Sequence, residues 1–313
     1  MAATTHDRPP ITLDSLGGDR GRARKELGIR ALFFSAASIS VLISALIVFS
    51  LAREAWTFVS QVEAASLWTS GWFPRRGLYD LLTLVAGSLL VTGIAIAVAG
   101  PIGMGAAVYL SEYARPRVRR VLKPVLEILA GIPSVVLGFF ALTFISPEII
   151  QRIQPDAQLF NLAAAGIGVG ILTIPLVASI AEDAMRSVPN ALREASYGMG
   201  ARKVTTSVRV VIPAAVSGLV AAFIVAFSRA IGETMVVFIA AGAGGGSGRN
   251  FDIFSSGQTM TAAMASLAAG TDQVKGAGLT FQRLFFVGAL LFVVTLTLNL
   301  LAGRFVRRVR QRY

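Results

Sequence analysis

Six runs of apolar residues, separated by polar segments, dominate the pattern along the chain. A helix needs about 20 mostly apolar residues to cross the hydrocarbon core of a bilayer. Six runs meet that length, at residues 31–51, 81–110, 124–145, 159–181, 212–241 and 284–305. The first run is not a cleavable signal peptide, because the polar segment 1–30 precedes it and no small-residue cleavage site follows. The pattern predicts an all-α integral membrane protein with six transmembrane helices.

Lysine and arginine residues predict how these helices are oriented. Most of the 29 lie in alternate segments, at 1–30, 111–123, 182–211 and from 304 onward. Cytoplasmic loops of membrane proteins carry such an excess of positive charge. We therefore expect both termini in the cytoplasm. The domain organisation that follows is a tail over 1–30, a first helix over 31–51, a core of five helices over 81–305 and a basic tail over 306–313.

Composition supports a membrane protein and argues against several classes of function. Hydrophobic residues make up 54% of the 313 residues and charged residues only 15%, against about a quarter in soluble domains. With no cysteine and one histidine, His6, we expect no disulfide, no thiolate metal site and no histidine-based active site. The net charge of +12 would suggest nucleic acid in a soluble protein. Here the basic loops account for it, and we expect no nucleic-acid partner.

Glycine-rich stretches do not carry the motifs of nucleotide binding. No G-x-x-x-x-G-K-[ST] occurs in the sequence, so we expect neither an ATP site nor an enzymatic activity in this chain. The stretch GAGGGSG at 242–248 predicts a flexible connector. In GIGVG, Gly166 and Gly170 have the spacing of small residues at close helix contacts in lipid.

The polar segment 182–211 predicts two short helices joined by a turn at Gly198 and Gly200. Such a segment is too polar to span a bilayer. Taken alone, it fits an amphipathic connector lying on the membrane surface as well as it fits a functional loop.

The detailed spacing in this segment resembles the coupling motif of ABC-importer permeases. The sequence has Glu194-Ala195-Ser196, three residues, Gly200, nine residues and then VVIP at 210–213. The family's pattern is E-A-A, three residues, Gly, nine residues and I-x-L-P, so Ser196 replaces an alanine. The resemblance implies that this loop, with Arg193 and Arg202 beside the motif, docks on a cytoplasmic ATPase subunit.

Two opposite charges interrupt the fifth apolar run, which reads AAFIVAFSRAIGETMVVFIAAG at 221–242. If the run is one helix, Arg229 and Glu233 are four residues apart and lie on one face. An arginine in mid-bilayer costs about 3 kcal/mol or more, and an ion pair recovers only part of this. The pair is therefore either a structural link between helices or an anion site. In an anion site the guanidinium binds an oxyanion and Glu233 balances its charge.

Other polar residues near the predicted midplane are secondary candidates for a transport path. Ser134 follows Pro133, whose ring removes a backbone donor, so GIPS predicts a kink that lines the path. Thr234 is adjacent to Glu233. Most of these serine and threonine side chains are expected to bond their own helix backbone, including those at 143, 173 and 228. Glu112 is expected to pair with the arginines beside it.

Four separated motifs resemble the permeases of the bacterial phosphate-specific import system. They are YLSEYA (109–114), GIPSVVLGFF (131–140), RAIGETM (229–235) and GQTMTAAMAS (257–266). The resemblance covers about residues 81–302 and is nearer to the C-type subunit (PstC-like) than to the A-type. It implies the type I importer permease fold and a place in the cytoplasmic (inner) membrane of a bacterium. It also implies that Arg229 and Glu233 lie on the phosphate path.

The same resemblance implies partners: a second, homologous permease, a dimer of ATPase subunits that holds ATP and Mg, and an external phosphate-binding protein. We therefore expect a permease that passes inorganic phosphate inward and binds no cofactor or metal itself. Two alternatives remain. One is a permease for another oxyanion, sulfate or molybdate, and the other is a stand-alone anion channel or secondary transporter that needs no ATPase.

Overall fold

The computed structural model describes residues 20–68, 71–76, 78–242, 251–270 and 280–309. The predicted connector 242–248 lies outside these residues except for Gly242, as do residues 1–19 and 310–313 of the predicted tails. Among the described residues, six helices are long and apolar enough to span a membrane. They are Arg24–Gln61, Leu81–Tyr113, Ser134–Ile153, Leu162–Arg186, Lys203–Ile231 and Gln282–Arg304. This confirms the predicted number of spans.

The chain divides into two compact units, residues 1–53 and 54–313. In the first, the described residues belong to one long helix, α2 (Arg20–Gln61), whose side chains from Arg24 to Ser50 are exposed. Long apolar side chains cover it on all sides, as expected for a helix surrounded by lipid.

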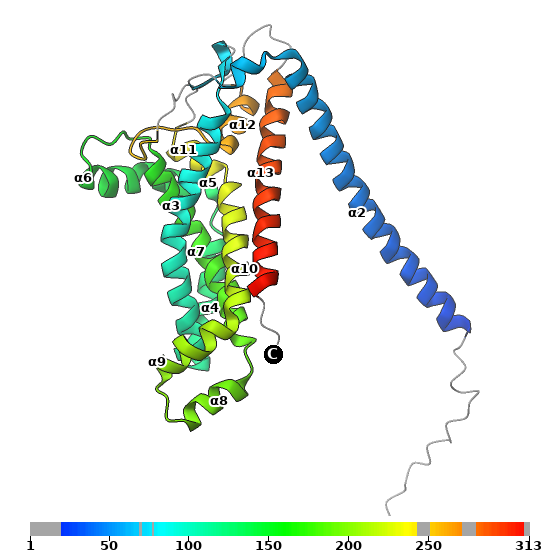
Figure 1. The fold of residues 1–313 in the computed structure, drawn as a ribbon, viewed down its shortest axis with the longest axis vertical. Helices are drawn as coiled ribbons and strands as arrows, with labels where there is room; N and C mark the ends of the chain where they lie inside the picture. The colour runs from blue at the N-terminus through cyan, green and yellow to red at the C-terminus, as the bar shows by residue number, and fades with distance from the viewer. Residues whose placement is uncertain (1–19, 69–70, 77, 243–250, 271–279, 310–313) are drawn as a thin grey trace, which may run out of the picture. The chain divides into compact units, whose positions relative to one another are not determined.

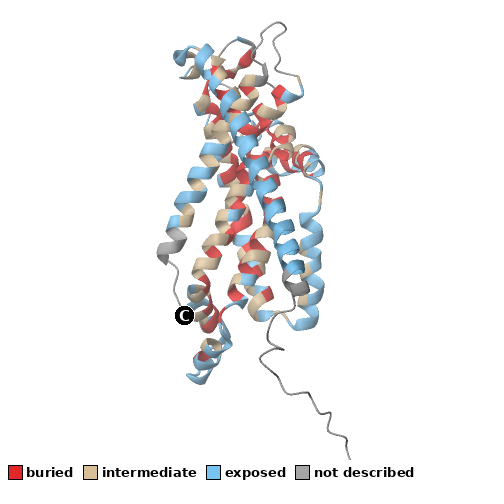
Figure 2. Cartoon of the chain, turned by 90° about the vertical axis from the view of Figure 1, so that its right-hand side faces the viewer, coloured by how far each residue is buried: buried red, intermediate tan, exposed pale blue. Residues whose placement is uncertain are grey.

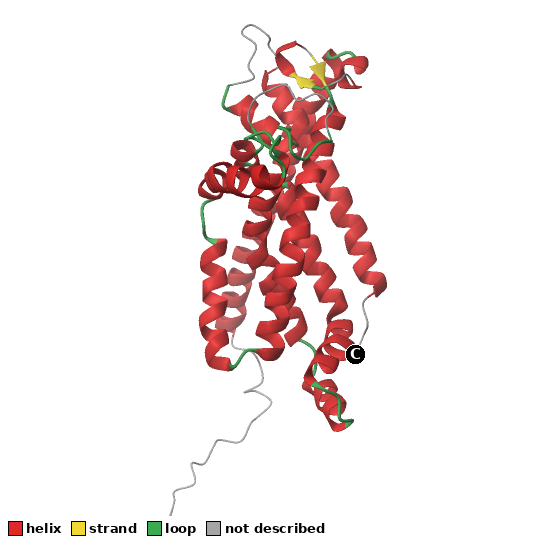
Figure 3. Cartoon of the chain, turned by 90° about the vertical axis from the view of Figure 1, so that its left-hand side faces the viewer, coloured by secondary structure: helices red, strands yellow, loops and turns green. Residues whose placement is uncertain are grey.

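The second unit begins with the last turns of α2, and its other described elements are helices and one small hairpin (Figure 1). Strands β1 (Trp72–Phe73) and β2 (Leu78–Tyr79) pair antiparallel (Figure 3). The other elements, in chain order, are η1 (Ala64–Trp68), η2 (Pro74–Arg76), α3 (Leu81–Val108), η3 (Tyr109–Tyr113), α4 (Pro116–Ala130), α5 (Ser134–Phe140), η4 (Ala141–Ile150), α6 (Gln151–Ile153), α7 (Leu162–Arg186), α8 (Asn190–Gly198), α9 (Lys203–Thr206), η5 (Ser207–Val211), α10 (Ile212–Ile231), α11 (Met235–Ala240), α12 (Met260–Ala268) and α13 (Thr280–Val309).

Helix α7 is the most enclosed of the six spans and packs closely on α3. A Cβ added at Gly166 would lie 2.7 Å from the Cβ of Ile94, and one at Gly170 would lie 2.9 Å from the Cβ of Val98. Only glycine allows the two backbones to come this close, which confirms the predicted packing role of these two residues. Figure 2 shows buried residues running along the helices in the middle of the unit.

Two buried polar side chains fix where the central helices begin. Asp80 caps α3 by accepting hydrogen bonds from the backbone N–H groups of Gly71 and Leu82 and from the hydroxyl of Thr83. Asn161 caps α7, because its Oδ1 accepts from the N–H of Ala164 at 2.7 Å. Each cap satisfies backbone donors that would otherwise lack a partner at a helix start.

The third span lies further along the chain than its predicted position at 124–145. The chain leaves helical geometry at residues 131–133, and the span is Ser134–Ile153. The break predicted at Pro133 is confirmed. The preceding residues form the separate helix α4, which carries cations on one face and exposed apolar side chains such as Val121 and Ile128 on the other. The prediction used apolar content alone, so it joined the end of this amphipathic helix to the span that follows it.

The fifth apolar run also contains a break, and this makes one prediction wrong. Helix α10 ends at Ile231, and α11 begins only at Met235. Arg229 lies in the last turn of α10, whereas Glu233 lies between the two helices. Arg229 and Glu233 therefore do not share the face of one helix, and no ion pair joins them. The physical reason is the segment 232–234, where glycine, a weak helix former, follows the last helical residue.

Candidate functional site

The predicted two-helix loop is present and lies at the end of the second unit opposite the hairpin (Figures 1 and 3). Helix α8 is followed by a turn in which Gly200 has φ +79°, and α9 leads through η5 into α10. That φ value strains any residue with a Cβ, so the turn at Gly200 is confirmed.

The tip of this loop exposes two large apolar side chains. Met199 is 84% exposed, and Val204 is 61% exposed. Glu194, Ala195 and Arg202, three members of the predicted coupling set, are exposed as well. Exposed apolar side chains with charged neighbours are typical of a protein–protein contact.

Arg193, another member of that set, is instead held by its own chain. Its guanidinium forms a salt bridge with Glu112 at 2.8 Å and donates to the carbonyls of Met185 and Val188 at 2.9 and 2.7 Å. Glu112 was expected to pair with the arginines next to it in sequence, and this was wrong. Its partner comes from 81 residues away, so the pair fastens α8 to the ends of two central helices.

Ser196, which stands where the motif has alanine, also has a structural reason. It is buried, and its Oγ lies 2.9 Å from the Oγ1 of Thr206, within hydrogen-bond distance. The two hydroxyls join the two short helices of the loop. The loop is therefore braced from inside by Arg193 and Ser196, and its outer face is exposed.

Arg229 lies on the surface of the second unit and has no ion pair among the described residues. It lines a cavity of about 290 Å³ together with Lys123, Glu127, Ser179 and Glu182. A charged arginine in a membrane-spanning helix is costly unless water, an anion or a partner chain reaches it.

The three other predicted path residues lie near the two helix breaks. Glu233 is half-buried in the α10–α11 break, where its backbone carbonyl accepts from the Thr261 hydroxyl at 2.8 Å. Thr234 is the N-cap residue of α11, and Ser134 opens α5. Helices α5 and α11 pack together, since a Cβ on Gly138 would lie 3.1 Å from that of Ile239.

No hydrogen bond or ion pair between described residues links Ser134 or Thr234 to Arg229. The Thr234 hydroxyl donates to the carbonyl of Gly232 at 3.3 Å. The hydroxyls at positions 143, 173 and 228 bond the carbonyls four residues earlier, as predicted.

One buried acid was missed by the reasoning from sequence. Glu182 has no exposed side-chain surface and forms ion pairs with Arg119 and, at 3.1 Å, with Lys123. The predicted polar loop starts at residue 182, but α7 continues to Arg186, so Glu182 is part of this helix. The available signal was charge: two acids at 182–183 face a basic run at 115–123 that the predicted topology puts on the same side.

Lys123 stays charged despite its partial burial. Burial opposes the charge, but the hydrogen bond to Asp183 at 3.0 Å and the interaction with Glu182 outweigh it. They hold the pKa of Lys123 above its usual value. The cavity that Arg229 lines therefore has a second positively charged side chain, Lys123, in its wall.

Comparison with known proteins decides the family. Residues 99–312 match the family described as "Binding-protein-dependent transport system inner membrane component". The chain belongs to this family. It is a multi-pass permease of the cytoplasmic membrane, and the type I importer fold and the resemblance predicted from its four motifs are confirmed.

The permease is similar in sequence to proteins named as phosphate transport system permeases. It is 29% identical to "Phosphate transport system permease protein PstC" of Haemophilus influenzae, over 87% of this chain and 90% of that protein. It is 33% identical to "Phosphate transport system permease protein PstC 1" of Mycobacterium tuberculosis, over 75% of each chain.

In structure, the permease resembles a chain of a bacterial ABC transporter involved in the import of the acidic polysaccharide alginate. The TM-score is 0.63 at 14% identity, over 93% of this chain and 100% of that one. At this identity the likeness shows the fold alone.

Proposed function

We propose that this permease carries inorganic phosphate inward, in an importer that an ATPase partner drives. The relatives named as phosphate permeases support the substrate. The single observation that carries the proposal is Arg229, an exposed cation in a spanning helix that lines a cavity and has no ion pair within the described part of the chain. A guanidinium binds two oxygens of a phosphate at once, which a point charge cannot do.

The exposure of Arg229 also supports the need for a second permease. Facing lipid, a charged arginine costs about 3 kcal/mol or more. A homologous permease packed over this face removes that cost and encloses a water-lined path between the two chains. Glu233, Thr234 and Ser134, at the helix breaks, supply further polar groups for the path.

The loop of α8 and α9 is proposed as the surface that contacts the ATPase and receives its movement. The sequence carries no phosphate-cradling motif, so ATP and Mg belong to a partner ATPase dimer. Exposed Glu194, Ala195, Met199 and Arg202 dock on it, with Gly200 shaping the turn. Closure of the ATPase dimer pushes the loop, and Arg193 transmits the movement to the helix ends. An external phosphate-binding protein then delivers phosphate from outside.

The test is uptake of labelled inorganic phosphate by vesicles that contain the assembled transporter. Arg229→Ala is expected to lower uptake by about a hundredfold, the loss typical of removing one partner of a desolvated charge pair. Arg117→Gln is the control, because Arg117 is exposed on α4 and does not line the cavity that Arg229 lines.

Three outcomes would contradict the proposal. Unchanged uptake by the Arg229→Ala variant would remove the residue from the path. Uptake of labelled sulfate or molybdate, but not of labelled phosphate, would assign another oxyanion. Uptake that persists without an ATPase subunit would assign a channel or secondary transporter.

A further inference from the structure

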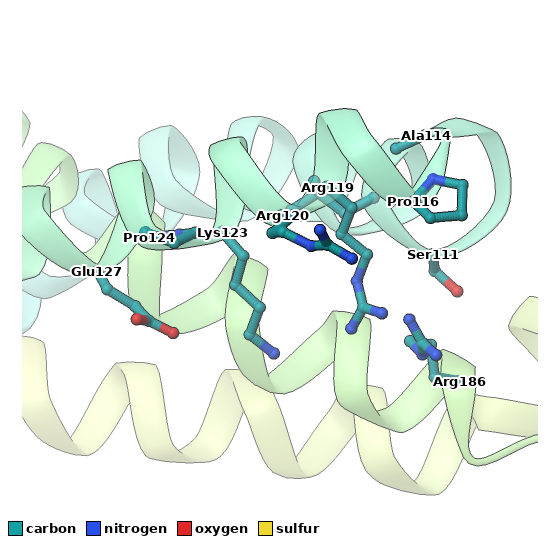
Figure 4. A pocket seen from close by; sticks show the side chains of 10 residues that line it. Ser111, Ala114, Pro116, Arg119, Arg120, Lys123, Pro124, Glu127 and Arg186 are labelled. Atoms are coloured by element: carbon teal, nitrogen blue, oxygen red, sulfur yellow. The ribbon is translucent and has the colours of Figure 1, made fainter.

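A second cavity, shown in Figure 4, lies where η3 leads into α4 and α7 ends, and it shares lining residues with the cavity that Arg229 lines. Its volume is about 530 Å³. Four cations line it: Arg119, Arg120 and Lys123 from α4, and Arg186 from the end of α7. Glu127 is the one carboxylate among its described lining residues. Figure 4 shows the side chains of Arg119 and Lys123 extending from α4 toward α7.

The carboxylate of Glu182 lies behind this cluster and does not neutralise it. It is within ion-pair distance of Arg119, Lys123 and, at 4.0 Å, Arg186. Lys123 also pairs with Asp183 at 3.0 Å, so two carboxylates face these three cations, and Arg120 adds a fourth positive charge to the lining. The Nε of Arg119 is buried without a hydrogen-bond partner in the described structure. A buried donor without an acceptor costs free energy that an incoming anion would recover.

The two cavities adjoin. Leu110, Lys123 and Glu127 line both of them. Lys123 therefore lies between Arg229 on one side and Arg119 with Arg186 on the other. A series of cations therefore leads from the spanning helix α10 toward the end of the unit where α8 and α9 lie.

We propose that this cluster is an exit site, where the tetrahedral oxyanion is held after it leaves Arg229 and before it is released. The inference rests on the proposed function. Its ligand is a doubly charged tetrahedral oxyanion, of which inorganic phosphate is the probe. Arg119 and Lys123 donate to it, and Glu182 balances the cluster when the site is empty. Several weak sites in series allow an ion to enter and still leave, which one tight site does not.

The first test measures uptake of labelled inorganic phosphate and ATP hydrolysis by the assembled transporter in vesicles. Lys123→Gln is expected to lower uptake about tenfold, the effect of one lost charge-assisted hydrogen bond. Arg117→Gln removes the same charge from the same helix outside both cavities, and its uptake is expected to equal that of the wild type. Equal uptake by wild type and Lys123→Gln would overturn the exit site.

A second pair of variants separates contact with the oxyanion from a merely structural role. Lys123→Arg keeps the charge and is expected to restore most of the uptake. The double variant Lys123→Gln/Glu182→Gln removes both members of the ion pair, so it leaves no buried carboxylate unpaired. It is expected to remain impaired. Recovery of wild-type uptake in the double variant would show that Lys123 serves only to neutralise Glu182, and would overturn the proposal.

The same donors would bind the phosphate of a lipid headgroup, so the lipid is varied. The loss in Lys123→Gln is expected to be equal in vesicles of phosphatidylcholine alone and in vesicles that contain phosphatidylglycerol. A loss confined to the anionic vesicles would assign the cluster to lipid and overturn the exit site. Failure of the wild type to carry phosphate in either vesicle would instead overturn the proposed function.

Discussion

The salt bridge between Arg193 and Glu112 predicts how strongly the loop of α8 and α9 is fastened to the helices behind it. The side chains are 15% and 4% exposed, so the pair is largely removed from water. Arg193→Ala would leave the carboxylate of Glu112 without its partner, together with the carbonyls of Met185 and Val188. Removing one partner of a buried pair costs about 3–5 kcal/mol. Because Arg193 retains some exposure, we expect about 3 kcal/mol, near the lower end of that range.

The loss is expected as local opening of the loop and not as loss of the fold. Amide hydrogen exchange over residues 190–206 reports that opening in the purified chain. A cost of about 3 kcal/mol corresponds to about a hundredfold faster exchange. Arg202→Ala is the matched control, because Arg202 lies in the same loop and its side chain is exposed. Its exchange is expected to match that of the wild type.

Amide exchange in Arg193→Ala that is no faster than in Arg202→Ala would contradict a fastening role for the salt bridge. The loop would then be held by other contacts, such as those of Leu192, the Ser196–Thr206 pair and Lys203 over the ring of Tyr113. A uniform acceleration across α3 and α7 would also contradict it, because the salt bridge would then stabilise the whole bundle.

Three further changes test the packing and the turns. In Gly170→Val the new Cβ would lie 2.9 Å from that of Val98. This overpacking is expected to lower the free energy of unfolding by about 1–3 kcal/mol, which a lower thermal unfolding temperature would report. Gly93→Val on α3 meets nothing within 4 Å and should leave it unchanged. Asp80→Ala removes the buried cap of α3 and should cost about 2 kcal/mol by the same measurement. Gly200→Ala, at φ +79°, should cost about 1 kcal/mol and speed exchange in the turn, and unchanged exchange would refute the strain.

The sequence was sufficient for the features that depend on local pattern. Runs of about 20 apolar residues predicted six spans because the bilayer thickness sets that length. Gly166 and Gly170 predicted a close helix contact because only a missing Cβ allows it. The turn at Gly200 and the break at Pro133 followed from backbone preferences of those two residues. The observed spans and dihedral angles agree with all four predictions.

Features that depend on tertiary contacts were not accessible in the same way. The fifth run is apolar on both sides of Gly232, so hydrophobicity alone gave no sign that Arg229 and Glu233 lie on different segments. The partner of Glu112 is 81 residues away, and local charge patterns pointed to its neighbours instead. Glu182 was overlooked because its burial results from packing of α4 on α7, which no local pattern encodes.

The account depends most on a water-lined position at residue 229 where positive charge is required. The chain contains no cysteine, so Arg229→Cys introduces a single thiol into it. In the assembled transporter, an aminoethyl thiosulfonate reagent would restore a positive charge there, and a methyl thiosulfonate reagent would not. We predict that the first restores part of the phosphate uptake and the second restores none, with wild type treated identically as the control. A thiol that reacts with neither reagent, or equal recovery with both, would contradict the account.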